Sequence, residues 1–200
     1  MPVDVVMEGG ETPKPATNRS VLRPARIAPV DEPTPEAQRL LDQSLSRNGH
    51  PLAIFRTLAK NPELFKQFNR LGGYLLTHGL LSEREREPVI LWVGWRCGSA
   101  YEFGQHILSG IASRLTETHI NQLATSDLAG WDTNDRDLVV MVDELCADNV
   151  VSDGSWRLLT RRSGEAQLIG LLLLFGYYRL VLGFLNGVGV QLDGGNPGWP

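Results

Sequence analysis

The chain has 200 residues, which suits one domain with tails, and a net charge of −4. An apolar fraction of 42% and a charged fraction of 21% are typical of a globular protein. No run of Lys and Arg exceeds two residues, as at Arg161-Arg162. Because a nucleic-acid-binding surface needs clustered positive charge, this composition excludes nucleic acid as an expected partner.

The two cysteines, Cys97 and Cys146, are too few for a disulfide framework and form no zinc-binding spacing. The N-terminal residues lack an apolar stretch after basic residues, so they do not resemble a signal peptide. Both features favour a reducing compartment, and we expect a cytoplasmic protein.

Taken in chain order, the sequence begins with residues 1–30, which contain five prolines and little periodic apolarity. They are expected to form a flexible, mobile N-terminal arm. Helix starts follow where a capping side chain precedes proline, at Thr34-Pro35 and Asn61-Pro62. Ser82 and Glu85 form a predicted capping box, and Gly49 indicates the end of a helix.

Further helix starts are expected at Thr116, Thr133, Ser152 and Ser163. Strand signals are poor, and Asn48-Gly49 does not join two alternating apolar runs. We therefore predict an all-α domain of seven or eight helices over residues 31–193, followed by a flexible tail over 194–200.

The segment from Ala166 to Leu192 is apolar enough to compare with a membrane span. Arg179 interrupts it, leaving about 13 uncharged residues on either side, whereas a span needs about 20. A buried core helix is therefore expected, and no membrane partner.

The densest set of functional groups lies between Glu83 and His106. Glu102 and His106 are four residues apart and would share one helix face. A carboxylate beside an imidazole orients it and raises its basicity, as a general base requires. Glu87, on the preceding helix, would approach the same point if the two helices form a hairpin, giving a second acid.

Other interpretations of these residues remain open. Ser99 and Glu102 have the spacing of a capping box, so Glu102 could serve only the helix end. The alternating charges around Glu87 could form a solvated face. Cys97, close to a helix start, could be a reactive thiolate, although a core role is expected for it and for Cys146.

The stretch LSEREREPVILWVGWRCGSAYEFGQHILSGIASRLTETHINQL resembles the signature region of the carboxymuconolactone decarboxylase family. This superfamily also contains the alkylhydroperoxidase D (AhpD) type proteins. Residues 61–76 and 167–193 resemble the family's preceding and late helices, so about 160 residues are covered. The resemblance implies an AhpD-like helical domain and a homo-oligomer, commonly a dimer, trimer or hexamer.

The peroxidase branch of the family uses a glutamate, a CxxC pair and a histidine. Placed on this sequence, the motif puts the glutamate at Glu87 and the histidine at His106, but Ser99 and Glu102 stand in the cysteine positions. The decarboxylase branch works without a thiol pair, by proton transfer on a lactone acid. In the types of residue at these positions, the sequence therefore resembles the decarboxylase branch.

We accordingly expect a cofactor-free lyase or isomerase acting on a small organic acid, lactone or enolisable carbonyl compound. His106 would move the proton, Glu102 would orient or share it, and Glu87 would be the second acid. Replacing His106 by alanine is then expected to abolish turnover at a nearly unchanged melting temperature. Substrate-binding candidates are Tyr101, Trp95, Arg96, Tyr178 and Asn186.

Three other functions are considered. The first is a thiol-dependent peroxidase using Cys97, and the second is a non-catalytic oligomeric scaffold. A metal site at His106 and the two carboxylates is the third, disfavoured because one histidine makes a poor zinc or iron site.

Overall fold

The computed structural model describes residues 22–125, 128 and 130–199, and over these residues it contains nine α helices, a short π-helical turn and one small hairpin. The first half of the chain contains α1 (Pro35–Asp42), β1 (Ser46–Arg47), β2 (His50–Pro51), α2 (Ala53–Leu58), α3 (Pro62–Gly73) and η1 (Tyr74–His78). The second half contains α4 (Glu83–Arg96), α5 (Ala100–Ala112), α6 (Glu117–Thr125), α7 (Thr133–Asp148), α8 (Asp153–Thr160) and α9 (Glu165–Val188). The all-α prediction is confirmed, with slightly more helices than expected.

The predicted capping residues begin several of these helices. Thr34 and Asn61 accept bonds from the third residue beyond them, and Ser82 and Glu85 form the expected capping box. Two predicted starts differ by one residue: Asp132 caps α7, and Gly164 precedes α9. Side chains with an oxygen near the backbone satisfy the free N–H groups at a helix start, so these positions were readable from sequence.

The prediction that Gly49 ends a helix, with no hairpin at Asn48-Gly49, is wrong. Helix α1 ends at Asp42, and Asn48-Gly49 forms the turn between β1 and β2. Both turn residues have positive φ, 52° and 78°, which is the conformation that an Asn-Gly hairpin turn requires. Each strand has only two residues, too short for the alternating pattern that identifies a strand.

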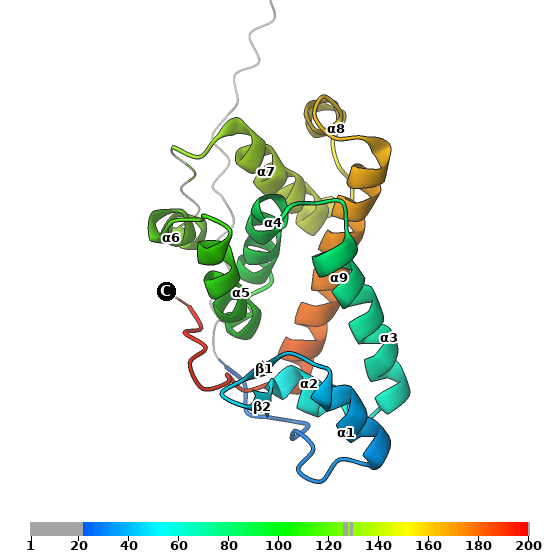
Figure 1. The fold of residues 1–200 in the computed structure, drawn as a ribbon. Coiled ribbons are helices and arrows are strands. Elements are labelled where there is room, and N and C mark those ends of the chain that lie inside the picture. The colour runs from blue at the N-terminus through cyan, green and yellow to red at the C-terminus, as the bar shows by residue number, and fades with distance from the viewer. Residues whose placement is uncertain (1–21, 126–127, 129, 200) are drawn as a thin grey trace, which may run out of the picture.

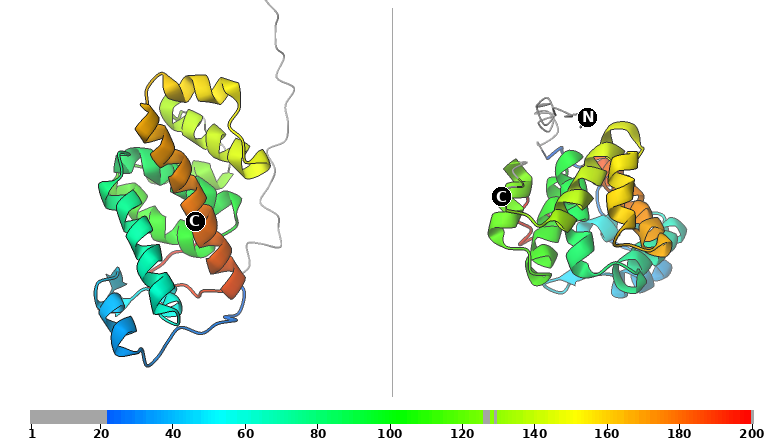
Figure 2. Two further views of the ribbon diagram at one scale, coloured as in Figure 1. Left: turned by 90° about the vertical axis from the view of Figure 1, so that its right-hand side faces the viewer. Right: turned by 90° about the horizontal axis from the view of Figure 1, so that it is seen from above.

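Helices α4 and α9 make the centre of the molecule. Helix α4 contacts α5, α7 and α9, and its residues Val89 to Val93 are at most 1% exposed. Figure 1 shows α9 running between α3 on one side and α4 and α5 on the other, while α1, α2 and the hairpin gather at one end. A second view shows α8 lying across the start of α9 (Figure 2).

By length and composition α9 would pass as a membrane span, with a mean hydropathy of 2.0 in its most apolar window. In this fold, however, 44% of that window is buried inside the protein. The buried side chains include Leu171, Leu174 and Leu182, each at most 2% exposed. One face of α9 thus belongs to the core, whereas Ile169, Leu173 and Leu180 on the rest of the helix are 57–60% exposed.

Both ends of the described chain pack against the helices. The arm predicted over residues 1–30 falls partly outside the described residues, but Arg26 N donates to Val188 O at 2.8 Å and Val30 N donates to Arg56 O at 3.0 Å. Residues 194–199, expected to be a flexible tail, instead lie against α5. Asn196 is 8% exposed and donates to the carbonyl of Tyr101 at 2.9 Å. The Trp199 and Trp95 rings meet edge to face, with centroids 5.2 Å apart.

Candidate functional site

Glu87, Glu102 and His106 meet in one cluster. His106 Nδ1 lies 2.8 Å from Glu87 Oε2, and His106 Nε2 lies 3.2 Å from Glu102 Oε1. The side chains are only 12%, 3% and 8% exposed for His106, Glu87 and Glu102 respectively. Each ring nitrogen therefore faces a separate buried carboxylate, and we call these three residues the acid–base triad.

The helical hairpin of α4 and α5 brings the triad together. Gly98 between the helices has a φ of 63°, a left-handed conformation that favours glycine, and it lets the chain reverse. Glu87 is in the second turn of α4, while Glu102 and His106 are one turn apart on α5. Ser99 makes no side-chain cap bond, so the capping-box alternative is wrong and the Glu102 carboxylate contacts His106 instead.

Tyr178 of α9 adds a fourth group to the triad. Its hydroxyl lies 3.3 Å from His106 Nε2, and the two rings meet edge to face with centroids 5.3 Å apart. Burial, together with the charges of Glu102 and Glu87, raises the pKa of Tyr178 well above its usual value. The phenol is therefore neutral at physiological pH and retains its proton as a hydrogen-bond donor.

The protonation state of His106 differs from that of a resting general base. Burial alone would lower its pKa, but the charge of Glu87 and the hydrogen bonds to both carboxylates outweigh burial and raise the pKa to about 10. At neutral pH the ring is thus an imidazolium whose N–H groups point to the two carboxylates. In this state His106 supplies protons and positive charge, so a carboxylate is better suited to accept a proton.

The triad and Tyr178 line a cavity of about 780 Å³. Apolar side chains make much of its wall: Leu52, Ile54, Phe55, Phe68, Leu76 and Val181. Two arginines also line it, Arg47 and Arg86. Among the described residues, Arg47 Nη1 and Arg86 Nε are buried and have no hydrogen-bond partner. These two N–H groups are available to an anionic ligand.

Sequence reasoning missed both arginines. Arg86 belongs to the alternating charges of Glu83 to Glu87, a pattern typical of a solvated face, yet its side chain is only 11% exposed. Arg47 comes from the hairpin that the sequence did not predict, and its Nη2 donates to Gln105 Oε1 at 2.7 Å. The apolar run that follows Arg86 is the sequence feature that could have indicated its burial. No feature of the sequence indicates that Arg47 lines the cavity.

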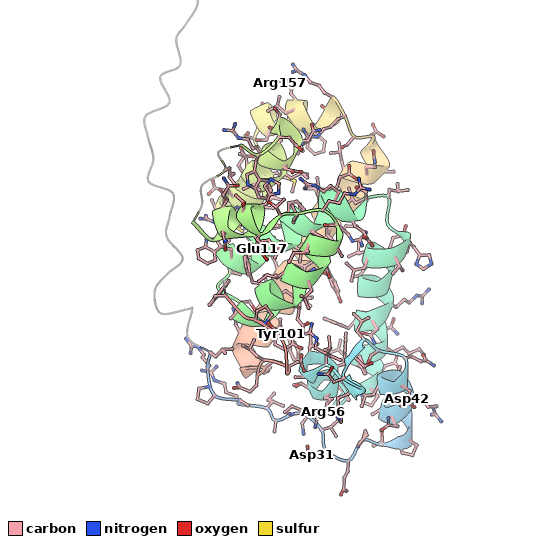
Figure 3. The ribbon with its side chains drawn as sticks, turned by 60° about the vertical axis from the view of Figure 1, so that its left-hand side comes forward. Asp31, Asp42, Arg56, Tyr101, Glu117 and Arg157 are labelled. Carbon is pink, nitrogen blue, oxygen red and sulfur yellow. The ribbon has the colours of Figure 1, made fainter. Side chains whose placement is uncertain are left out.

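Tyr101 lines the cavity, as the sequence suggested, but its hydroxyl is already engaged. It donates to Asp193 Oδ2 at 2.5 Å and accepts from Ile54 N at 3.3 Å. Figure 3 shows Tyr101 at the level of the C-terminal part of α9. Its contribution is therefore to join α5, α2 and the segment after α9 below the cavity.

The other predicted substrate contacts lie elsewhere. Trp95 packs against Phe103 and Trp199, and Arg96 pairs with Asp143 of α7 at 2.9 Å. Asn186 donates to the carbonyl of Cys97 at 3.0 Å. None of these residues, and not Cys97, is among the described residues that line the cavity. Trp95 thus faces the C-terminal segment, and Arg96 faces α7.

Within the described part of the chain, no group of three or more His, Cys, Asp or Glu side chains is arranged to hold a metal ion. The triad is also internal to one chain and faces a cavity, whereas a scaffold would use it at an exposed interface.

Comparison with solved structures assigns the class of fold. The chain has the AhpD-like helical fold, which the alkylhydroperoxidase AhpD core protein from Ralstonia eutropha JMP134 shares with a TM-score of 0.70. That protein, described as peroxidase-related and uncharacterised, is 19% identical over 86% of this chain and 94% of its own.

Two further neighbours have the same fold. An uncharacterised peroxidase-related protein from Silicibacter sp. TM1040 has a TM-score of 0.72 and 16% identity, over 88% of this chain and 97% of its own. A protein of unknown function from Agrobacterium tumefaciens, proposed to be the antioxidant defence protein AhpD, has a TM-score of 0.61 and 19% identity, over 68% of this chain and 94% of its own. No protein-family model and no curated protein matches the chain.

Proposed function

We propose that this protein is a cofactor-free acid–base enzyme that moves a proton to or from carbon in a small organic acid, lactone or enolisable carbonyl compound. The observation that carries the proposal is the convergence of Glu87, Glu102, His106 and Tyr178 on one partly apolar cavity. Buried groups of this kind stabilise developing charge far better than the same groups in bulk water.

The substrate class follows from the cavity wall. A carboxylate or lactone oxygen would accept hydrogen bonds from Arg86 Nε and Arg47 Nη1, whose protons have no partner among the described residues. The apolar side chains would surround the carbon skeleton. A cavity of about 780 Å³ accommodates a molecule of this size with room for bound water.

The proposed base is Glu102. It and the Tyr178 hydroxyl both lie beside His106 Nε2, at 3.2 and 3.3 Å, so one substrate can contact both. Glu102 removes a proton from the carbon next to the carbonyl, and the electron pair of the C–H bond moves to the carbonyl oxygen as an enolate. Tyr178 donates a hydrogen bond to that oxygen. Returning the proton from Glu102 to another carbon completes an isomerisation.

His106 and Glu87 hold this arrangement. The imidazolium, bound to Glu87 through Nδ1, keeps a positive charge beside Glu102 before and during the transfer. Decarboxylation uses the same groups, since loss of CO₂ also leaves an enolate that takes its proton from an acid. This chemistry matches the decarboxylase branch that the sequence resembles, and it needs no thiol where Ser99 and Glu102 replace the cysteine pair.

Exchange of carbon-bound hydrogen tests the proposal without knowing the final product. A panel of small keto acids and lactones is incubated with the protein in D₂O, and loss of C–H signals is followed by proton NMR. We expect enzyme-dependent exchange for at least one anionic compound, reduced at least 100-fold by Glu102→Gln and by about 100-fold or more by Tyr178→Phe.

The matched control is Glu117→Gln, an exposed glutamate of α6 that Figure 3 shows on the surface, which should leave exchange unchanged. Arg86→Gln should raise the KM of an anionic substrate more than that of a neutral analogue. Exchange that persists in Glu102→Gln, or none with any compound in the panel, would refute the mechanism.

The assembly and location remain proposals as well. We infer that the protein is a homo-oligomer because of the family resemblance, and that it is cytoplasmic because of its cysteine usage. Sedimentation velocity of the purified protein measures the oligomeric state. A single sedimenting species at the mass of one chain contradicts it.

A further inference from the structure

A row of polar side chains leads from the β1–β2 hairpin to the segment after α9, apart from the acid–base triad. Arg47 of β1 donates from Nη2 to Gln105 Oε1 at 2.7 Å, and Gln105 donates from Nε2 to Asp193 Oδ2 at 2.9 Å. Arg47 and Gln105 both line the cavity, whereas Asp193 follows the end of α9. We call these three residues the arginine relay.

Asp193 anchors the relay at its far end. Its Oδ2 also accepts from the Tyr101 hydroxyl at 2.5 Å, and its Oδ1 accepts from Ala53 N at 2.8 Å. An ionised carboxylate accepts hydrogen bonds but donates none. Three donors, two from α5 and one from the start of α2, therefore hold the Asp193 carboxylate in place.

The Asp193 carboxylate decides which way the Gln105 amide points. Because the carboxylate can only accept, the NH₂ group of Gln105 has to face it, and the carbonyl oxygen of the same amide then faces the hairpin. That oxygen accepts from Nη2 of Arg47. The reverse orientation would place an NH₂ group against a guanidinium and a carbonyl oxygen against a carboxylate, so both hydrogen bonds would be lost.

Arg47 is left with an unused donor. Its Nη1 is buried and has no hydrogen-bond partner among the described residues. The aliphatic part of the side chain lies against the C-terminal segment, since a Cβ atom at Gly195 would be 3.8 Å from Arg47 Cδ. The side chain is thus held at Nη2 and along its stem. A buried N–H group without an acceptor costs free energy, which a ligand in the cavity would recover.

We propose that Arg47 is the specificity-determining residue that selects an anionic over a neutral ligand, and that Gln105 and Asp193 are positioning residues that aim it. The ligand class is a small carboxylate, whose oxygen accepts from Arg47 Nη1 in a charge-assisted hydrogen bond. Arg47 acts on binding alone, so this role rests on the proposed function only for the use of the cavity as a substrate site. Selectivity is then controlled from Asp193, which is not among the described residues that line the cavity.

The first test compares two probes of similar shape that differ in charge. Isothermal titration calorimetry of the full-length protein measures the affinities of benzoate and of benzamide, its neutral counterpart. The wild type should bind benzoate about 10-fold more tightly, the ratio expected of one charge-assisted hydrogen bond. Arg47→Met should lower this ratio by about 5-fold or more and leave the affinity for benzamide nearly unchanged.

Two results of this titration would overturn the proposal. One is a wild-type protein that binds both probes equally or does not bind benzoate. The other is a benzoate-to-benzamide ratio that stays the same in Arg47→Met.

Variants of the two positioning residues test the relay itself. Gln105→Leu keeps most of the side-chain volume but removes both hydrogen bonds, and Asp193→Ala removes the acceptor that orients the Gln105 amide. Each should lower the benzoate-to-benzamide ratio by about 3-fold or more, although Arg47 is still present. Gln67→Leu changes an exposed glutamine of α3 that is not among the described residues lining the cavity. It is the matched control and should leave the ratio unchanged.

A purely structural role of the relay predicts a different pattern. Loss of packing would weaken benzoate and benzamide together and keep their ratio, whereas loss of aim weakens benzoate alone. Thermal unfolding shows whether each variant is folded, and if Asp193→Ala does not fold, Gln105→Leu decides. An unchanged ratio in folded Gln105→Leu would refute the relay.

Failure of the relay and failure of the proposed function give different results. If a keto acid still exchanges its carbon-bound hydrogen with D₂O but the relay variants keep the wild-type ratio, the acid–base function stands and the relay is refuted. If the relay variants lower the ratio as expected but no compound in the panel exchanges hydrogen, Arg47 still selects carboxylates and the acid–base function is refuted.

Discussion

His106 holds two buried negative charges apart at the centre of the site. Its ring lies between Glu87 and Glu102, at 2.8 and 3.2 Å, and all three side chains are at least 88% shielded from solvent. Buried carboxylates without a counter-charge are costly, so the imidazolium contributes to folding as well as to the proposed chemistry.

Replacing His106 by alanine is expected to destabilise the protein by about 3–5 kcal/mol, because it leaves two buried carboxylates facing each other. This revises the sequence-based expectation of an unchanged melting temperature. Denaturant unfolding at pH 7.5 measures the effect. His78→Ala, at an exposed position in η1, is the control and should change stability by no more than about 0.5 kcal/mol. A triad variant as stable as this control would contradict the buried ion cluster.

The pH dependence of stability should show the same interaction. The pKa of His106 is raised from 6.5 to about 10, so its contribution is fully present below pH 6.5 and is lost as the pH rises through 10. One proton gives a slope of at most about 1.4 kcal/mol per pH unit.

This measurement needs the Cys97→Ser/Cys146→Ser background. The neighbouring Cys97 and the charge of Arg179 lower the pKa of Cys146 to about 6, which gives a slope of opposite sign, with stability gained as the pH rises from about 6 toward 9. In the double variant the free energy of unfolding should fall steadily between pH 7 and 9.5. A flat or rising profile there would argue against the protonated His106.

At the scale of elements, the position of Tyr178 depends on how closely α9 approaches α3. Tyr177, its neighbour, donates from its hydroxyl to the carbonyl of Phe68 at 3.2 Å. The Tyr177 ring lies directly against Gly72, where a Cβ atom would collide with the hydroxyl. Gly73, next in the helix, has open space at its Cβ position.

Gly72→Ala should therefore destabilise the protein by about 1–3 kcal/mol, because the ring has to move. Displacing Tyr177 also shifts Tyr178, so exchange activity should fall as well. Gly73→Ala is a matched control in the same turn of α3 and should stabilise the helix by up to about 1 kcal/mol. Thermal unfolding of both variants checks the difference, and equal effects would contradict the close packing of α3 on α9.

The whole molecule is closed by its C-terminal segment. Asn196 binds the backbone of α5, and the Trp199 ring lies 5.2 Å from the rings of both Trp95 and Phe103. The segment thereby covers the side of the α4–α5 hairpin opposite the cavity. Its packing supports the same two helices that carry the acid–base triad.

Trp199→Ala is expected to lower the free energy of unfolding by about 1.5–3 kcal/mol, the cost of returning a large apolar side chain to water. Trp156→Ala provides the comparison, since Trp156 is 41% exposed on α8, and its effect should be smaller. Calorimetry distinguishes the two. If Trp199→Ala is the milder change, the C-terminal segment does not stabilise the fold.

The helical architecture could be predicted because its signals are local. Capping residues at Thr34, Asn61 and Ser82 act within one turn, so their effect is visible in sequence. The packing of residues 194–199 could not be predicted, since glycines and prolines mark a loop without showing what Asn196 or Trp199 contacts.

The site could be predicted only in part, because local spacing is visible in the sequence and long-range packing is not. Glu102 and His106 share a helix turn, so their pairing follows from spacing, and the family resemblance added Glu87. Tyr178 was a candidate from the sequence, but its contact with His106 depends on how α9 packs against α5. Arg47 reaches the cavity from the hairpin, and Arg86 reaches it from α4 beside Glu87, through packing that spacing does not encode.

The protonation state of His106 tests the central claim most directly, because the whole account assigns the base to a carboxylate beside an imidazolium. Nitrogen NMR of protein labelled with ¹⁵N-histidine, recorded from pH 5 to 11 and assigned with the His106→Gln variant, reports both ring nitrogens. We expect imidazolium shifts at both nitrogens up to a midpoint near pH 10. A neutral ring at pH 7.5, or a midpoint near the usual 6.5, would contradict the account.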